Sequence, residues 1–214
     1  MLDIKVEVRD FSLINFLSSP ICIVGTDFRL TKAEKDVIMN SQYDKPRGQS
    51  EGVLVTENHK ILDTPELGRP KTFIENMTQN FVKSDLKINN EFYMTQSWAT
   101  INEKNCKHHN HSHPNTLLSA VYYVNAESGQ LVINSERNTL FPNFDFQFDV
   151  EEHNVFNSKS WKIDVKTGDL VIFPGWLNHY STSNENEEPR VLIGANFFTR
   201  GTFGKYENTD LLEL

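Results

Sequence analysis

Apolar and polar positions divide this 214-residue chain into a mixed first part and a second part dominated by strands. From Glu91 onward the two kinds of residue tend to alternate, which is the period of a half-buried strand. We expect strands at residues 92–101, 117–124, 130–134, 144–150, 160–165, 169–173 and 190–199, with turns at Gly129, Pro142, Gly168 and Gly175. Short strands this frequent, preceded by helices, predict a mainly β (α+β) fold: a double-stranded β-helix, or jelly roll, supported by N-terminal helices on one face.

Two helices are expected in the first ninety residues. Thr31 and Glu34 have the spacing of a capping box, in which each side chain bonds the backbone N–H of the other, and a helix to about Asn40 would follow. Pro70 suits the first turn of a second helix. The apolar residues of that helix recur at helical spacing, so one side should pack against a sheet; they are Phe73, Ile74, Met77, Phe81 and Val82.

The rest of the N-terminal part is less regular. Residues 4–8 and 21–24 fit short strands, whereas residues 41–58 are polar and indicate a surface loop. No internal repeat or low-complexity run divides the chain, so we expect a single domain over residues 1–214. Its parts would be the flanking helices and strands at residues 1–90, the β-helix core at residues 91–200 and a loosely held tail at residues 201–214.

The composition is that of a globular protein, with 38% hydrophobic and 23% charged residues. A net charge of −8 and a pI near 5.4 argue against general affinity for nucleic acid or for an anionic membrane. Cys22 and Cys106 have neither the spacing of a metal site nor the number needed for a disulfide scaffold. The first thirty residues lack a signal-peptide pattern and no apolar stretch reaches membrane-spanning length, so a cytoplasmic location is expected.

Histidines occur in two places that suit metal binding. His111 and His113 lie two residues apart before an apolar run, so in a strand both would point to the same face and could share one ion. Much later in the chain, His179 follows the buried run at residues 169–173 and could complete a facial set of ligands. Imidazole binds iron, zinc, copper and nickel, so these residues alone do not name the metal.

Other residues near these histidines have ordinary structural interpretations. His109 is in phase with His111 and His113, which leaves the register of this segment ambiguous. The remaining assignments are a solvated basic loop for His108 and His153, core packing for Phe173 and Trp176, and a turn for Asp169.

Four segments resemble the iron(II)/2-oxoglutarate-dependent oxygenase superfamily in sequence, order and spacing. They are His111-Ser112-His113-Pro114 and residues 119–124 (SAVYYV), 173–179 (FPGWLNH) and 190–198 (RVLIGANFF). Within the superfamily they are most similar to a group of largely uncharacterised bacterial and phage members, with prolyl hydroxylases as more distant relatives. The resemblance extends over residues 92–200 and implies a catalytic jelly-roll core.

The resemblance implies one iron(II) ion held by His111, His113 and His179. The superfamily usually has aspartate or glutamate where His113 stands, and three neutral imidazoles would leave the metal more positive. The alternative is a carboxylate from elsewhere, of which Glu103 and Glu127 are nearest in sequence.

The resemblance also implies the co-substrates, which are 2-oxoglutarate and dioxygen. 2-Oxoglutarate would chelate the iron through its keto-acid end, and Arg190 would hold its distal carboxylate in a bidentate pair. Tyr123 matches a position that often hydrogen-bonds the same carboxylate, the alternative being an aromatic residue of the core. For Arg190 the alternative is a surface ion pair with Glu185, Glu187 or Glu188. Such an enzyme forms succinate and carbon dioxide while it hydroxylates a C–H bond of its substrate.

The substrate and the oligomeric state are left open, and residues 41–58 or 134–144 could form the rim of a substrate pocket. Two other functions fit parts of the pattern. A cupin-type metalloenzyme that does not use 2-oxoglutarate shares the barrel, but its first motif would need a glutamate where Leu117 and Leu118 stand. A non-catalytic jelly-roll binding module would leave the three spaced histidines without a role.

Overall fold

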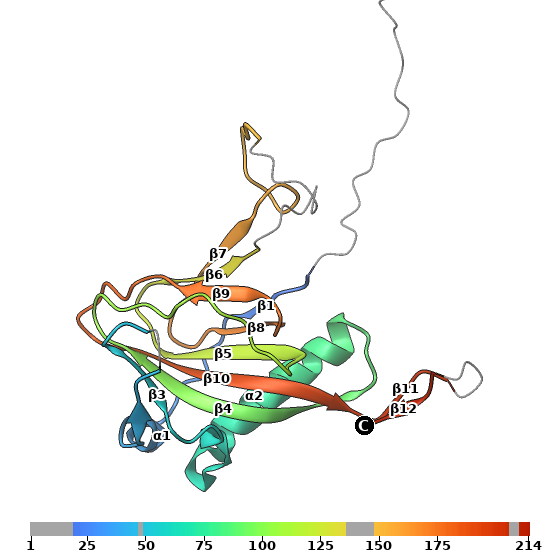
Figure 1. Ribbon diagram of the computed structural model, residues 1–214. Coiled ribbons are helices and arrows are strands. Elements are labelled where there is room, and N and C mark those ends of the chain that lie inside the picture. Colours follow the sequence, from blue (N-terminus) through green and yellow to red (C-terminus); the bar gives the residue numbers. More distant parts are fainter. Residues whose placement is uncertain (1–18, 47–48, 136–147, 206–209) are drawn as a thin grey trace, which may run out of the picture.

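The computed structural model describes residues 19–46, 49–135, 148–205 and 210–214. Two antiparallel sheets face each other, and the helices cover the outer face of the larger sheet (Figure 1). This arrangement confirms the predicted jelly roll with helical support on one face. The predicted strand at residues 4–8 and the predicted turn at Pro142 lie outside the described residues.

The larger sheet has the strand order β1-β8-β5-β10-β4-β3-β2, and the smaller has the order β7-β6-β9. The strands of the larger sheet are β1 (Cys22–Val24), β2 (Tyr43–Asp44), β3 (Val53–Thr56), β4 (Glu91–Asn102), β5 (Leu118–Asn125), β8 (Leu170–Pro174) and β10 (Arg190–Arg200). Those of the smaller sheet are β6 (Gln130–Asn134), β7 (Ser160–Asp164) and β9 (Asn178–Ser181). The helices are α1 (Lys32–Met39) and α2 (Gly68–Asn80), with two 3-10 turns before α2 (Ile61–Asp63 and Pro65–Leu67) and a π-helical turn after it (Phe81–Asp85).

Both faces of the larger sheet are buried, which explains why its central strands have nearly continuous apolar sequences. Along β5, Ala120 and Tyr122 belong to the core beneath the helices, whereas Val121 and Tyr123 belong to the core between the sheets. The same alternation continues on β8 and β10, because successive side chains of a strand point to opposite faces. The core between the sheets is therefore lined by alternate residues of β5, β8 and β10.

Most of the elements expected from the sequence are present. Strands β1, β4, β5, β6, β7, β8 and β10 match predicted strands within one or two residues, and both helices form as expected. Thr31 and Glu34 form the predicted capping box, and α2 packs on β4 and β5 with Ile74 buried. Gly129 and Gly168 have positive φ angles, as their predicted turns require.

Three expectations were wrong in part. Residues 41–58 are not only a loop, because β2 and β3 form there and extend the larger sheet. Residues 148–150 form no strand; the rest of the predicted strand at 144–150 is outside the described residues. The described part of the tail forms a small hairpin of β11 (Thr202–Phe203) and β12 (Leu212–Glu213), so it is more ordered than predicted. None of the described helices is long and apolar enough to cross a membrane.

A buried carboxylate joins the two helices on this outer face. The Glu34 side chain accepts hydrogen bonds from the Thr31 backbone N–H at 2.6 Å and from Arg69 at 2.5 and 2.8 Å. Burial alone would raise the pKa of Glu34, but the bonds from Arg69 and Thr31 outweigh it and hold this pKa below its ordinary value. Glu34 thus fixes the start of α1 against the first turn of α2.

We predict that Glu34→Gln lowers the free energy of unfolding by about 1–2 kcal/mol at pH 7, because glutamine keeps the capping geometry but loses the charge, and Arg69 is half exposed. A carboxylate with a lowered folded pKa stabilises the protein above its unfolded pKa of about 4.3 and loses this effect as the pH falls through the folded value. The difference between wild type and variant in urea unfolding should therefore shrink below about pH 4.3.

The matched control is Asp63→Asn, which breaks an exposed ion pair with Lys71. We expect it to change the free energy of unfolding by less than about 1 kcal/mol. An equal loss in both variants would contradict the anchoring role of Glu34.

Candidate active site

A short backbone bridge brings two of the predicted ligands together. The N–H of His111 donates to the carbonyl of His179 at 3.0 Å, and the N–H of His179 donates to the carbonyl of His111 at 2.8 Å. Residues that face each other in an antiparallel pair carry their side chains on the same side. The two imidazole rings accordingly lie with their centroids 4.3 Å apart.

His179 does not lie at the end of β8 but on a separate strand, β9. The chain turns at Gly175 and Trp176 and passes to the smaller sheet, where His179 lies on β9 opposite Ile133. Phe173 packs edge-on against the His179 ring at 4.6 Å, so this histidine faces the core between the sheets. Its side chain is buried.

His113 reaches the same point without being in a strand. The expectation that His111 and His113 share a strand face was wrong, because only the single bridge at His111 is formed in this segment. The N–H of His113 instead donates to the carbonyl of Gly175 at 2.8 Å, which ties the segment to the turn before β9. The His113 ring lies 5.0 Å from that of His111 and 5.1 Å from that of His179.

Hydrogen bonds at Nδ1 place the lone pair of two rings on Nε2, the atom that would bind a metal. Nδ1 of His111 lies 2.9 Å from the carbonyl oxygen of His109, and Nδ1 of His179 lies 3.0 Å from that of Leu177. A carbonyl can only accept, so both Nδ1 atoms carry the proton and both Nε2 atoms carry a lone pair. Nε2 of His113 lies 3.3 Å from Nε2 of His179.

The environment keeps these imidazoles neutral. Burial is the main cause and the neighbouring histidines add to it, lowering the pKa of His113 to about 4 and that of His179 to about 3. Burial also lowers the pKa of His111, although the bond to the His109 carbonyl opposes it. Neutral imidazole is the form that binds a metal ion.

The three rings have the spacing of a metal site. A ligand nitrogen lies about 2.1 Å from the ion and the ring centroid about 1.1 Å further, so rings at 90–109° have centroids roughly 4.5–5.2 Å apart. The distances of 4.3, 5.0 and 5.1 Å between His111, His113 and His179 are close to this range. Among the described residues, Glu103 and Glu127 belong to no group of potential ligands, so the carboxylate alternative finds no support.

Of the other histidines with a predicted place, one differs from the prediction. His108 is half-buried against the His111 ring at 4.6 Å and is not a solvated loop residue. His109 is exposed and does not join His113 and His179, which resolves the register ambiguity. His153 is exposed, as predicted.

Arg190 is almost completely buried, with 2% of its surface exposed, so the alternative of a surface ion pair was wrong. Its terminal nitrogens donate to backbone carbonyls: Nη1 to Thr182 at 2.9 Å, and Nη2 to Ser183 at 3.0 Å and Ser128 at 3.4 Å. Gly129 has φ 134° and lies so close that a Cβ atom there would be 2.4 Å from Nη2. The guanidinium is therefore clamped in a fixed position.

The charge of Arg190 has no partner of opposite sign. In the part of the chain that the structure describes, its side chain forms no ion pair, and its Nε has no hydrogen-bond partner. Burial lowers the pKa of Arg190 and Tyr123 opposes that shift, but a guanidinium stays charged at neutral pH. A buried, unpaired cation is costly unless an anion completes it.

Two buried polar residues of β4 lie on the strand next to Arg190. Asn102 lies opposite Arg190 in the sheet register, and Thr100 lies opposite Leu192. Both are fully buried, and the Asn102 amide and the Thr100 hydroxyl lack hydrogen-bond partners among the described residues. Buried polar groups are nearly always paired, so these groups are candidate hydrogen-bond partners for a polar ligand. Sequence reasoning missed it, although the polar alternate positions of β4 were a usable signal.

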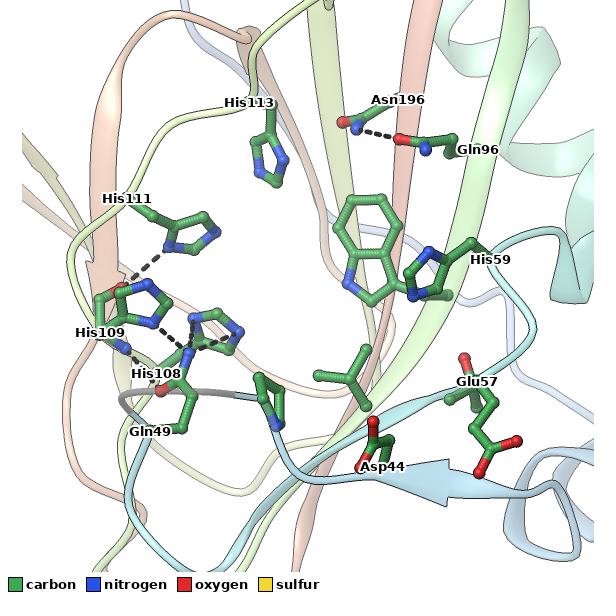
Figure 2. A pocket seen from close by; sticks show the side chains of 14 residues that line it. Asp44, Gln49, Glu57, His59, Gln96, His108, His109, His111, His113 and Asn196 are labelled. Atoms are coloured by element: carbon green, nitrogen blue, oxygen red, sulfur yellow. Dashed lines mark hydrogen bonds between the residues drawn. The ribbon is translucent and has the colours of Figure 1, made fainter.

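A cavity of about 560 Å³ opens in front of His111 and His113. Figure 2 shows His108, His109 and His111 on one side of it and His59, Glu57 and Asp44 on the other. Several of its residues come from 41–58, so this segment does form a pocket rim as the sequence suggested. The fourteen lining residues among those described include two carboxylates, those of Asp44 and Glu57.

Trp98 forms the wall of the cavity next to His113, with ring centroids 5.4 Å apart. It can lie there because Gly194 is opposite it on β10; a Cβ atom at Gly194 would be 2.5 Å from the indole ring.

Trp176 is 65% exposed, so its predicted place in the core was wrong, whereas Phe173 is fully buried as expected. Asp169 accepts a bond from the Lys166 N–H and is a turn residue, as predicted.

A family model described as "Putative 2OG-Fe(II) oxygenase" matches residues 96–196, which contain all the predicted site residues. This match covers much of the jelly-roll core and supports the superfamily assignment that the resemblance implied. The description of this model names iron(II) and 2-oxoglutarate, which are the metal and co-substrate that the resemblance implied. Among curated protein sequences, none matches the chain.

Several solved structures have a similar fold. An oxidoreductase of this family from Burkholderia pseudomallei superposes with a TM-score of 0.56 at 9% identity, covering 83% of each chain. HygX from Streptomyces hygroscopicus, solved with nickel, 2-oxoglutarate and hygromycin B, gives 0.59 at 12% identity over 84% of this chain and 82% of its own. The α-ketoglutarate-dependent carbocyclase SnoK from nogalamycin biosynthesis gives 0.58 at 14% identity over 84% and 79%. These likenesses confirm the fold class.

Proposed function

We propose that this oxygenase hydroxylates a C–H bond of a substrate held in the cavity, using iron bound by His111, His113 and His179. The observation that carries the proposal is that neutral imidazoles and a buried, unpaired cation share the space between the sheets. Phe173 links the two, because it packs on His179 and belongs to the same core as Tyr123, which lies near Arg190. When bound, iron(II) and 2-oxoglutarate supply the oxidising chemistry that the side chains lack.

The three imidazoles suit a divalent ion. They are neutral, two of them direct Nε2 inward by donating from Nδ1 to carbonyls, and such outer bonds orient metal ligands in known sites. With no carboxylate in the set, the site carries one negative charge fewer than a two-histidine, one-carboxylate site. An anionic co-substrate that binds the metal would supply negative charge instead.

The distal carboxylate of 2-oxoglutarate is proposed to lie against Arg190. Nη2 already donates to two carbonyls and Nη1 to one, so Nε is the guanidinium nitrogen without a partner, and the bidentate fork expected from the sequence is not fully open. The unpaired amide of Asn102, opposite Arg190, offers a second donor. Tyr123 contributes a hydroxyl whose pKa burial raises, so it stays protonated and can donate.

The substrate would approach from the cavity side. His111, His113 and Trp98 line its inner end, so a molecule there lies next to the proposed metal and away from the buried arginine. Among the described residues, the lining carries the carboxylates of Asp44 and Glu57, and these favour a neutral or cationic substrate over an anion. The cupin alternative accounts for the histidines but gives no role to the unpaired Arg190.

We predict that Arg190→Ala weakens 2-oxoglutarate binding to the metal-loaded protein by about thirtyfold or more. The reason is that the carboxylate loses its buried charged partner, a loss of roughly 2–5 kcal/mol in comparable pairs. Isothermal titration calorimetry measures the effect. The control is Arg200→Ala on the same strand, whose exposed side chain pairs with Glu91 and should not affect binding.

Arg190→Ala also removes three bonds to backbone carbonyls, so its folding is checked by thermal melting. If it does not fold, Asn102→Ala provides the test, with a loss of several-fold expected from one hydrogen bond. Wild-type affinity for 2-oxoglutarate in a folded Arg190→Ala protein would contradict the proposal and favour the cupin alternative.

A second prediction concerns the unusual ligand. His113→Asp should retain iron and keep forming succinate from 2-oxoglutarate, because aspartate can offer one donor atom and gives the two-histidine, one-carboxylate set that favours iron(II). His111→Ala and His179→Ala should lose more than about a hundredfold of this turnover. Elemental analysis and a succinate assay measure both quantities. Full metal content and turnover in His113→Ala would show that His113 is not a ligand.

A further inference from the structure

A second group of three histidines lies on the cavity side of the proposed iron site. We call His108, His109 and His111 the outer set, and His111, His113 and His179 the inner set. In each set the potential ligand atoms lie within 4.8 Å of one another. The ring centroids of the outer set are 4.6, 5.0 and 5.2 Å apart, which fits the roughly 4.5–5.2 Å expected of imidazoles around one ion.

The position of Gln49 is an independent sign that the outer rings face a common point. Its Oε1 accepts a bond from the His109 backbone N–H at 3.1 Å, which fixes the orientation of the amide. Its Nε2 then contacts Nδ1 of His109 and lies 3.2 and 3.3 Å from the ring nitrogens of His108 (Figure 2). The amide nitrogen of Gln49 thus contacts Nδ1 of His109 and also lies against the His108 ring, so it occupies the space between two of the outer rings, where a cation would bind.

The two sets share His111, and this residue can serve only one of them at a time. Its Nδ1 donates to the carbonyl of His109, so Nε2 is its one lone pair. An ion bound by the outer set therefore takes the third ligand of the inner set, and the reverse also holds. His109 is exposed and His179 is buried, so an ion arriving from solvent meets the outer set first.

We propose that the outer set is a second metal site, which binds a divalent transition metal such as zinc, nickel or copper and competes with the inner set for His111. Neutral imidazoles suit these ions and do not discriminate among them. Binding at the outer set requires the Gln49 amide to move aside and leaves the inner set with two ligands. Excess zinc would then release iron from the inner set without entering it. The proposal does not depend on the reaction that the enzyme catalyses.

The test uses zinc binding in competition with a chromophoric chelator. The outer-only variant is His113→Ala/His179→Ala, the inner-only variant is His108→Ala/His109→Ala, and a quadruple variant combines all four changes. We expect each double variant to bind one zinc ion at least about a hundredfold more tightly than the quadruple variant. Wild type should bind one zinc ion through its histidines, not two. His153→Ala, which removes an exposed histidine elsewhere, is the control and should match wild type.

An outer-only variant that binds zinc no better than the quadruple variant would overturn the second site. Two tightly bound zinc ions in wild type would overturn the competition for His111. Loss of zinc from the inner-only variant would instead contradict the proposed iron site, so the two failures are distinguishable. If the outer-only variant does not fold, His113→Phe/His179→Phe retains the ring volume without the nitrogen ligands and gives the same comparison.

Discussion

The candidate site depends on the two backbone hydrogen bonds between His111 and His179. His179 lies on β9 of the smaller sheet, whereas His111 lies in an irregular segment that the bridge attaches to that strand. The third histidine is fixed by the bond from His113 to the carbonyl of Gly175, at the turn between β8 and β9. Both segments are therefore attached at the same place, where the chain passes from the larger sheet to the smaller one.

The second constraint is the cost of burying Arg190. Desolvating a guanidinium without a carboxylate partner is unfavourable, and three carbonyls reduce that cost only in part. The Asn102 amide and the Thr100 hydroxyl are also buried without partners, which is rare and adds to this cost. In the proposed complex, the distal carboxylate of 2-oxoglutarate would be the missing partner of Arg190 and Asn102.

The sequence predicted the regular parts of this protein well, because they follow from local rules. Alternation defined β4 and β10, and the Thr31 capping box defined the start of α1. The irregular parts depend on tertiary contacts that no periodicity records. His111 and His113 meet through a bridge and a turn contact instead of a shared strand, and Trp176 points outward despite its apolar character.

The sequence identified most residues of the candidate site, but not how they contact one another. The role of Arg190 was implied by the resemblance, yet its carbonyl clamp combines the loop just before β10 with Ser128, which is 62 residues away in the sequence. Asn102 was passed over although polar residues alternate along β4, because the sequence pattern does not show that Arg190 lies opposite it. His108 was assigned to a solvated loop because its contact with the His111 ring depends on how the segment folds back.

The central claim is that one metal ion and 2-oxoglutarate occupy the space between the sheets, from the inner histidines to Arg190. Anomalous diffraction at the iron edge from crystals grown without oxygen, in the presence of iron(II) and 2-oxoglutarate, tests it most directly. The account predicts one anomalous peak about 2.0–2.2 Å from ring nitrogens of His111, His113 and His179, with the distal carboxylate against Nε of Arg190. An iron peak away from these three rings, or 2-oxoglutarate bound without contact to Arg190, would contradict it.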